Sequence, residues 1–564
     1  MLRPTNPNLL LLKSLLWLPA LPPQPLRISF RPFPFPNARL ASLSMYVASA
    51  SSDCAWHSRI LVLASSHCSP SPDGRYVATV RSSTLSVRSV ETLQLVNVRK
   101  LAQGISGPIC SLLWAPSSSK VLISTAHHIH LVSAVDRSFD ASIQAPTPAG
   151  GTPAALHFGA RDTEVFASSP LGLKFCVLDL STSKVVEISN PKFHQPSTAS
   201  RGFCLHPDTG HLALLTRVGG KDLVSVHHPA TRQVQRSWSP DTVDAQGLLW
   251  TPDGRWLLLW ESPAHGHRLL LYTPDGQHFR TLGPSSLATP QVPRTERALG
   301  LGIKACRLSP NAELCAVGDH SRDVVVLSTQ SWREKMKLMH PTTIVPRDTT
   351  RVWQEQLVDA NAKQSMPPFV QATLSVSPPG PSSDAKGAVP LTSGCSLARF
   401  DASSTLMATR LDDSPSTVWI WDLAAAELRA VLVFHSHVTF KWHPTAREVL
   451  AVNCQDEVRR GASFVWDPLL NGPTSVSPED HLPTVAKAGG KPRVAWLNRQ
   501  SELPSLLLAD AQHYVLLSLS GTEQGPNPWH RGDWDGAWAI ADESAMLGID
   551  DTSALDDTFS FKYA

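Results

Sequence analysis

The sequence predicts an all-β protein built as a propeller, because one short unit recurs along most of the chain. In each unit an apolar stretch runs into a turn, usually containing proline, and a second apolar stretch follows. Nine such turns can be recognised, and most follow one another at intervals of 43 to 48 residues. This interval is the length of one four-stranded propeller blade. The turns are centred near positions 72, 116, 159, 207, 252, 310, 401, 444 and 497.

The clearest turns have the residues that a tight reversal requires. They are Ser-Pro-Asp-Gly at 71–74 and Trp-Thr-Pro-Asp-Gly at 250–254. Proline fixes the first central φ, aspartate accepts hydrogen bonds from the turn backbone, and glycine adopts a positive φ without strain. Each turn therefore predicts that the two apolar stretches beside it pair as antiparallel strands.

The stretches after these turns are apolar on both faces, as at 256–260 and 269–272. A strand stacked between two neighbouring blades needs such a pattern, whereas a strand with one solvated face would alternate. Two units also contain Trp-Asp as the end of an apolar stretch, at 421–422 and 466–467, and on this basis we expect these dipeptides to close their blades. The sequence thus predicts a WD40-type β-propeller.

A generic β-sandwich also has short strands and frequent turns, but it does not account for the longer interval. The number of blades is less well determined. Nine units are more than a seven-bladed ring needs and fewer than two rings need. The sequence leaves two possibilities open. Either one ring is accompanied by a partial or degenerate second ring, or further blades exist whose sequences are too degenerate to recognise.

Composition divides the chain into five parts. Residues 1–52 are basic, acid-free and rich in proline, which indicates a disordered extension or a start site assigned too early. A mitochondrial targeting peptide is also basic and acid-free, but the prolines disfavour the helix that it requires. We expect blades over 53–358 and 393–540, an exposed Pro/Ser/Gly-rich insertion at 359–392, and a short acidic tail at 541–564.

The charge balance of the 564 residues is close to neutral, with a formal net charge of +3. This disfavours a protein that holds nucleic acid mainly by neutralising phosphates. No run of about 18 uncharged apolar residues occurs, so we expect no membrane partner. Nine scattered cysteines without a CxxC pair fit reduced thiols in the cytosol or nucleus.

The sequence contains no phosphate-binding glycine loop, no HExxH and no GxSxG. Histidines cluster locally, as at His127, His128 and His130, but no cysteine or acid completes a zinc-ligand set. The aspartate pairs at 412–413 and 550–551 have no catalytic companion, and we expect solvated loop charges there. We therefore expect no enzyme activity and assign no catalytic, cofactor-binding or metal-ligating residue.

Most of the 17 tryptophans lie at repeat positions, where they would fill space between blades. Trp529, Trp534 and Trp538 differ, because they follow the last recognisable turn. They belong either to the last blade or to a surface that docks a partner, since tryptophan is frequent in binding hot spots. We put forward no other residues for partner binding.

Several segments resemble the WD repeat-containing protein 8 family, over about residues 60–520. The most recognisable stretch is Leu-Gly-Ile-Lys at 301–304, followed by Trp332 and by His-Pro at 340–341. The Pro-rich insertion follows in the family's order, whereas the first 50 or so residues have no family counterpart. The other segments that carry the resemblance are 224–226, 241–242, 247–254, 270–276, 408–410 and 418–422.

The resemblance implies a non-enzymatic scaffold at the spindle pole body or centrosome. Family members work with a coiled-coil spindle-anchoring protein and, in fungi, with a minus-end kinesin-14, and they anchor microtubule minus ends and help to assemble the mitotic spindle. An adaptor subunit of another complex, such as a ubiquitin ligase or an RNA-processing assembly, would use the same fold. The residues leave that alternative open.

Overall fold

A computed structural model gives the structure of this chain. It describes residues 56–58, 61–62, 67–81, 83–101, 108–145, 155–168, 173–192, 202–283, 302–356, 368–380, 393–446, 448–456, 461–482, 492–498, 504–519 and 529. These residues belong to one compact unit, 49–564. The expected extension 1–52 and acidic tail 541–564 lie outside the described residues.

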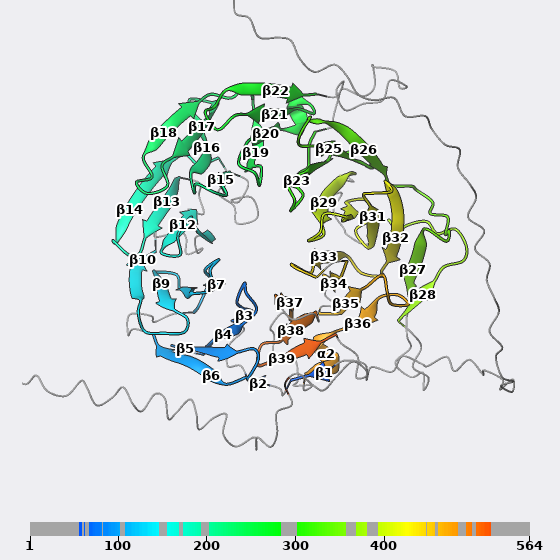
Figure 1. Ribbon diagram of the computed structural model, residues 1–564, viewed down its shortest axis with the longest axis horizontal. Helices are drawn as coiled ribbons and strands as arrows, with labels where there is room; N and C mark the ends of the chain where they lie inside the picture. The colour runs from blue at the N-terminus through cyan, green and yellow to red at the C-terminus, as the bar shows by residue number, and fades with distance from the viewer. Residues whose placement is uncertain are drawn as a thin grey trace, which may run out of the picture. The chain divides into compact units, whose positions relative to one another are not determined.

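Nine sheets, which we call blades 1 to 9, follow one another around a single ring in chain order (Figure 1). Each of the nine recognised turns lies in one blade, between its first and second strands. Among the described residues there is no second, partial ring. Blade 1 has β3 (Cys68–Pro70), β4 (Tyr76–Arg81), β5 (Thr84–Ser89) and β6 (Leu95–Lys100); blade 2 has β7 (Ser111–Trp114), β8 (Lys120–Ser124), β9 (His128–Ser133) and β10 (Asp140–Gln144); blade 3 has β11 (Ala155–Phe158), β12 (Glu164–Ser168), β13 (Lys174–Asp179) and β14 (Lys184–Ser189).

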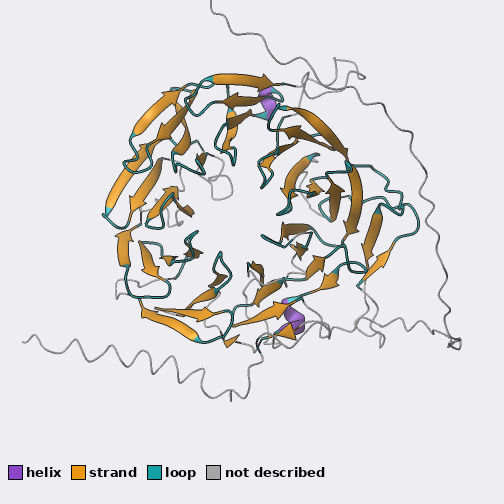
Figure 2. Cartoon of the chain, in the orientation of Figure 1, coloured by secondary structure: helices purple, strands orange, loops and turns teal. Residues whose placement is uncertain are grey.

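Strands dominate the remaining blades too, and helix is confined to η2 (Pro263–His265) and α2 (Pro478–His481) in the part described (Figure 2). Blade 4 has β15 (Phe203–Leu205), β16 (Leu212–Val218), β17 (Lys221–His227) and β18 (Val234–Trp238); blade 5 has β19 (Ala245–Trp250), β20 (Leu257–Glu261), β21 (Leu269–Tyr272) and β22 (His278–Leu282); blade 6 has β23 (Ala305–Leu308), β24 (Leu314–Gly318), β25 (Asp323–Ser328) and β26 (Arg333–Met339). Blade 7 has β29 (Cys395–Phe400), β30 (Leu406–Leu411), β31 (Thr417–Asp422) and β32 (Glu427–Val433); blade 8 has β33 (Val438–Trp442), β34 (Leu450–Cys454), β35 (Ser463–Trp466) and β36 (Thr474–Ser475); blade 9 has β37 (Arg493–Leu497), β38 (Ser505–Ala509) and β39 (His513–Ser518).

The ring is closed by the start of the described chain. β1 (Trp56–His57) and β2 (Leu61–Val62) both pair antiparallel with β39, so blade 9 contains strands from both ends of the described chain. A buried cluster joins Val77 and Val90 of blade 1 to Leu507 and Leu516 of blade 9. Because closure leaves no open face between the first and last blades, all nine blades share one continuous ring.

Five of the repeat turns contain a residue of the same left-handed conformation even where their sequences differ. Gly74 and Gly254 have φ of 69° and 68°, and the same left-handed conformation recurs at Ser118, Ala312 and Ser404. At Gly254 an added Cβ would lie within 3 Å of the His206 imidazole, so glycine is required there for space as well as for φ. The degenerate copies thus keep the geometry of the turn after losing its glycine.

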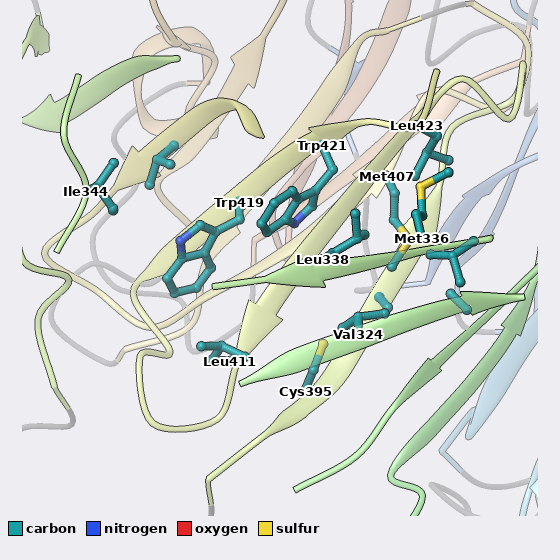
Figure 3. Packing of buried hydrophobic residues seen from close by; sticks show 14 of the residues in the cluster. Val324, Met336, Leu338, Ile344, Cys395, Met407, Leu411, Trp419, Trp421 and Leu423 are labelled. Atoms are coloured by element: carbon teal, nitrogen blue, oxygen red, sulfur yellow. The ribbon is translucent and has the colours of Figure 1, made fainter. Parts of the chain in front are cut away.

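The core lies between neighbouring blades. In the interface of blades 6 and 7, Val324 and Met336 of one sheet pack against Met407, Trp419 and other residues of the next (Figure 3). Trp419 has no exposed surface. Because both faces of these sheets are buried, their strands are apolar throughout and do not alternate with polar residues. Truncating a buried tryptophan to alanine typically lowers the free energy of unfolding by about 3–5 kcal/mol.

The expectation for the Trp-Asp dipeptides was wrong in one respect. Each lies at the end of the third strand of its sheet, with Asp422 as the last residue of β31 and Asp467 directly after β35. An outer fourth strand of the same sheet follows, β32 in blade 7 and β36 in blade 8. The Asp422 carboxylate accepts hydrogen bonds from the backbone N–H groups of Ala424 and Ala425. The aspartate therefore shapes the turn into the outer strand and does not close the blade.

The part of the expected insertion 359–392 that the structure describes, 368–380, is mostly exposed but includes a strand of blade 7. β27 (Arg351–Glu355) pairs in parallel with β32, and β28 (Phe369–Gln371) pairs with β27, which extends blade 7 to six strands. Phe369 and Val376 are buried against the blade. These two apolar side chains give an otherwise Pro/Ser-rich segment a surface to bury. Residues 359–367 and 381–392 lie outside the described residues.

Candidate binding site on the inner wall

Of the three tryptophans put forward for partner binding, only Trp529 is described. Its indole N–H donates to the carbonyl oxygen of Val90 at 2.9 Å, and its ring packs on the cluster shared by blades 1 and 9. This contact favours packing over partner docking at Trp529. Trp534 and Trp538 lie outside the described residues, where docking stays a prediction.

The histidine group of blade 2 has no third ligand. The rings of His128 and His130 lie 6.1 Å apart on β9, as their spacing predicted, and His127 precedes the strand. Burial and the charge of His128 lower the pKa of His130. Within the described ranges no group of three or more His, Cys, Asp or Glu residues could hold a metal ion. All eight cysteines that the structure describes are free thiols. No helix there is long and apolar enough to cross a membrane.

The prediction of solvated charge at Asp412 and Asp413 was wrong. The Lys304 ammonium contacts the Asp412 carboxylate at 2.6 Å, and Arg322 pairs with Asp413 at 2.5 Å. Both pairs join blade 6 to blade 7, and the aspartate side chains are only 14% and 17% exposed. Sequence spacing could not show this, because the partners are about 90 to 108 residues apart. Lys304 of the Leu-Gly-Ile-Lys stretch is thus a structural residue.

His340 is also structural. Its Nδ1–H donates to the Arg322 carbonyl oxygen, and its Nε2 accepts from the Thr409 hydroxyl at 2.7 Å. The Trp421 indole N–H donates to the same hydroxyl at 2.9 Å. Burial lowers the pKa of His340 to about 4, so the ring is neutral near pH 7, as this hydrogen-bond pattern requires. His340, which belongs to a stretch that carries the family resemblance, therefore connects the end of blade 6 to blade 7 through hydrogen bonds.

The inner strands carry a charge pattern that the sequence analysis missed. None of the nine first strands contains an aspartate or glutamate, and those of blades 1 to 5 contain no Lys or Arg either. Blades 6 to 9 each contribute one cation, Arg307, Arg399, Lys441 and Arg493. We call these four residues the cationic wall. Figure 1 shows their strands, β23, β29, β33 and β37, on the inner side of the ring.

Local strand geometry explains the position of the cations. Arg307, Arg399 and Lys441 each precede the last residue of their strand, and that last residue packs into an interblade cluster. Because side chains alternate along a strand, each cation points to the opposite face from its buried neighbour. A comparison of this one position across the nine units would have found these three cations, whereas Arg493 is the first residue of its strand.

Three of the cations line one cavity. Arg307, Arg399 and Lys441 surround a space of about 360 Å³ whose rim includes the turn residues Pro310 and Pro444. Desolvation and the charge of Arg307 lower the pKa of Arg399. The carboxylate of Asp401, which also borders the cavity, accepts hydrogen bonds within its own turn from Ser403 and the backbone N–H of Leu406. Three like charges thus face this space, and none forms an ion pair within the described ranges.

A second cavity of about 390 Å³ continues the wall into blades 8, 9 and 1. It is lined by Lys441 and Arg493 together with Ser69 and Asn453. The Asn453 Oδ1 atom is buried without a hydrogen-bond partner. Among the described residues, Arg493 donates one long hydrogen bond, at 3.4 Å, to the Cys68 carbonyl oxygen. Both cavities have the size of small-ligand sites.

The arrangement is suited to binding anions. Guanidinium groups bind carboxylates with two parallel hydrogen bonds, and lysine adds a point charge. An incoming carboxylate would also offset the repulsion between neighbouring cations. The 390 Å³ cavity also includes the thiols of Cys68 and Cys454, and burial raises the pKa of Cys68 to about 12. The 360 Å³ cavity also includes Asp401 and His443. The cations nevertheless make anion binding the chemistry that this surface suits best.

Comparison with known proteins agrees with the fold. No family model matches the chain. It is similar to the WD repeat-containing protein WRAP73 of Mus musculus, with 24% identity over 83% of this chain and 96% of that protein. It is also similar to an uncharacterized WD repeat-containing protein of Schizosaccharomyces pombe, with 23% identity over 71% and 79%.

The solved structures that match the chain have little sequence in common with it. The C-terminal WD40 domain of Sif2 matches with a TM-score of 0.40 and 10% identity, over 70% of this chain and 95% of that one. A crystal structure of the eukaryotic initiation factor matches with a TM-score of 0.45 and 10% identity, over 73% and 88%. The sheet order, the ring and its closure make this chain a nine-bladed WD40-type β-propeller.

Proposed function

We propose that this chain is a non-enzymatic scaffold that binds proteins at the spindle pole body or centrosome. The observation that carries the binding role is the cationic wall, four Lys or Arg residues on inner strands that contain no acid. We further propose that an acidic segment of a partner protein binds there. A closed ring suits this role, because its rigid sheets keep the cations in place before a partner arrives.

The location and the named partners come from the family resemblance. The similarity to WD repeat-containing proteins along most of the chain supports that comparison. We propose a coiled-coil spindle-anchoring protein and a minus-end kinesin-14 as partners, with anchoring of microtubule minus ends as the joint function. The net charge of +3 gives no reason to expect the chain itself to bind the acidic microtubule surface.

Live imaging of the protein at native expression, with a tag at residue 564 and a spindle-pole marker, tests the proposed location. We expect persistent foci on both poles through mitosis. Diffuse signal at every stage would contradict the proposal and leave an adaptor role in another complex. A tag at this end avoids the uncertain start of the chain.

A further inference from the structure

The chain carries its own acidic segment, residues 541–564. This segment has six carboxylates and a single lysine, Lys562. The carboxylates belong to Asp542, Glu543, Asp550, Asp551, Asp556 and Asp557. Its charge is therefore opposite to that of the cationic wall, and the two are close in magnitude.

We propose that the acidic segment 541–564 binds the cationic wall of the same chain. Carboxylates of the segment pair with Arg399 and Lys441, whose side chains are exposed in the cavity. The pairing relieves the repulsion among the cations of the wall and gives them the counter-charges that the inner strands lack. The proposal rests on the binding role assigned to the wall above and adds a regulation to it.

Trp529, the last described residue, lies on the same side of the ring as the rim of the cavity. Trp529 is anchored on Val90, and the Val90 N–H donates to the Arg75 carbonyl oxygen in the first turn of blade 1. The first turns of blades 6 and 8 form the rim of the cavity beside Arg307, Arg399 and Lys441. The first turn of blade 1, near which Trp529 is anchored, therefore lies on the same side of the ring as the turns that form the cavity rim.

The segment is long enough to reach the wall. Asp542 is 13 positions after Trp529, which corresponds to roughly 40 Å of extended chain. Blade 1 borders the cavity that contains Lys441 and Arg493. Neighbouring sheets are about 10 Å apart, so blade 8 lies about 20 Å from blade 1. Because the segment is tethered, its effective concentration at the wall is on the order of millimolar.

Binding in cis would make the wall a competitive site. A partner segment would have to displace residues 541–564, so only a strongly acidic partner would bind the resting protein. Removing the six charges would leave the cationic wall accessible to a partner and would strengthen partner binding.

Zero-length carbodiimide cross-linking of the full chain tests the contact directly. We expect mass spectrometry to find an amide between Lys441 and a carboxylate of 541–564, with a yield independent of protein concentration. Lys441→Arg is the matched control, because it keeps the charge and removes the amine, so the link should disappear. A Lys441 that links only to other segments, or only at high concentration and between chains, would overturn the proposal.

Peptide competition gives a second measurement. A fluorescent peptide of residues 541–564 is titrated into the wild-type chain and into a full chain with the six acids changed to Asn or Gln. We expect the neutralised chain to bind at least about tenfold more tightly, since its own segment no longer competes. Equal binding by the two chains would overturn the proposal.

The double variant R399E/K441E in the neutralised background locates the binding. We expect it to lose peptide binding, while R333E/K335E, with two exposed cations on the outer strand β26, keeps it. Peptide binding that survives R399E/K441E would place the segment elsewhere and overturn the proposal. Failure of these tests would leave the proposed scaffold function standing, because that function is tested by location at the poles.

Discussion

Two charged regions of the ring are used in opposite ways. Between blades 3 and 4, the Arg232 guanidinium donates two hydrogen bonds of 2.6 Å to the Glu164 carboxylate, and both side chains are at most 2% exposed. Two further bonds run from the Ala160 N–H to the Glu164 carboxylate and from Arg232 to the Gly210 carbonyl oxygen. On the inner wall, Arg399 and Lys441 are exposed and form no ion pair with any described carboxylate.

The difference separates charges that hold blades together from charges that are available to a ligand. A buried ion pair that loses one partner leaves an uncompensated charge and is costly. An exposed cation next to other cations is stabilised by nothing in the ring, so its removal should change binding and leave the fold intact. The predictions below test this contrast.

The largest effect is expected from Glu164→Gln. It leaves the Arg232 guanidinium buried without a counter-charge, and should lower the free energy of unfolding by about 3–5 kcal/mol. Chemical denaturation measures the change. Glu187→Gln in the same blade is the control, because the Lys174–Glu187 pair is about half exposed on both sides and should contribute less than about 1 kcal/mol. Equal losses in the two variants would refute the contrast.

The second prediction concerns His340, which is neutral in the folded ring. Its folded pKa of about 4 lies below the ordinary value of 6.5, so protons favour the unfolded chain. Stability should be constant above pH 6.5 and fall as the pH drops towards 4, by about 2 kcal/mol between pH 7 and pH 5. His443, with a pKa of about 4, adds to the fall. Denaturation midpoints at the two pH values should differ less in His340→Gln than in the wild type, and an unchanged slope would count against this assignment.

A smaller loss is expected from Lys304→Met. The ammonium contacts the Asp412 carboxylate and the Ser393 carbonyl oxygen, both at 2.6 Å, and is 14% exposed. Losing these contacts between blades 6 and 7 should cost about 1–2 kcal/mol. Denaturation of Asp412→Asn and of the double variant would give the coupling energy, and a coupling near zero would show that the pair contributes nothing.

The smallest change in stability is expected from R399E/K441E. Both side chains are exposed and make no described ion pair, so the free energy of unfolding should shift by less than about 0.5 kcal/mol. A large loss would mean that the cationic wall belongs to the structural charges and would remove its binding role.

The sequence was sufficient for the fold class and insufficient for the site. The turn residues and the spacing of the units predicted a propeller with nine repeat units, because local turn chemistry and periodicity follow directly from the chain. They left the number of blades and the closure of the ring open. The Lys304–Asp412 pair and the role of His340 could not be predicted, since they join residues some 70 to 110 positions apart.

The cationic wall was present in the sequence as one residue in each of four units. It was missed because it becomes visible only when the units are aligned by their strands. β27 and β28 were missed for a different reason. Two buried side chains, Phe369 and Val376, order a segment whose average composition predicts exposure.

The central proposal is that the cationic wall recruits a partner and that the ring acts at the spindle pole through this partner. Live imaging of R399E/K441E beside R333E/K335E and the wild type, each tagged at residue 564 and expressed at the native level, tests it most directly. We predict foci at both poles for the wild type and the outer-strand variant, and diffuse signal at equal abundance for the wall variant. Polar foci of R399E/K441E equal to those of the wild type would contradict the claim.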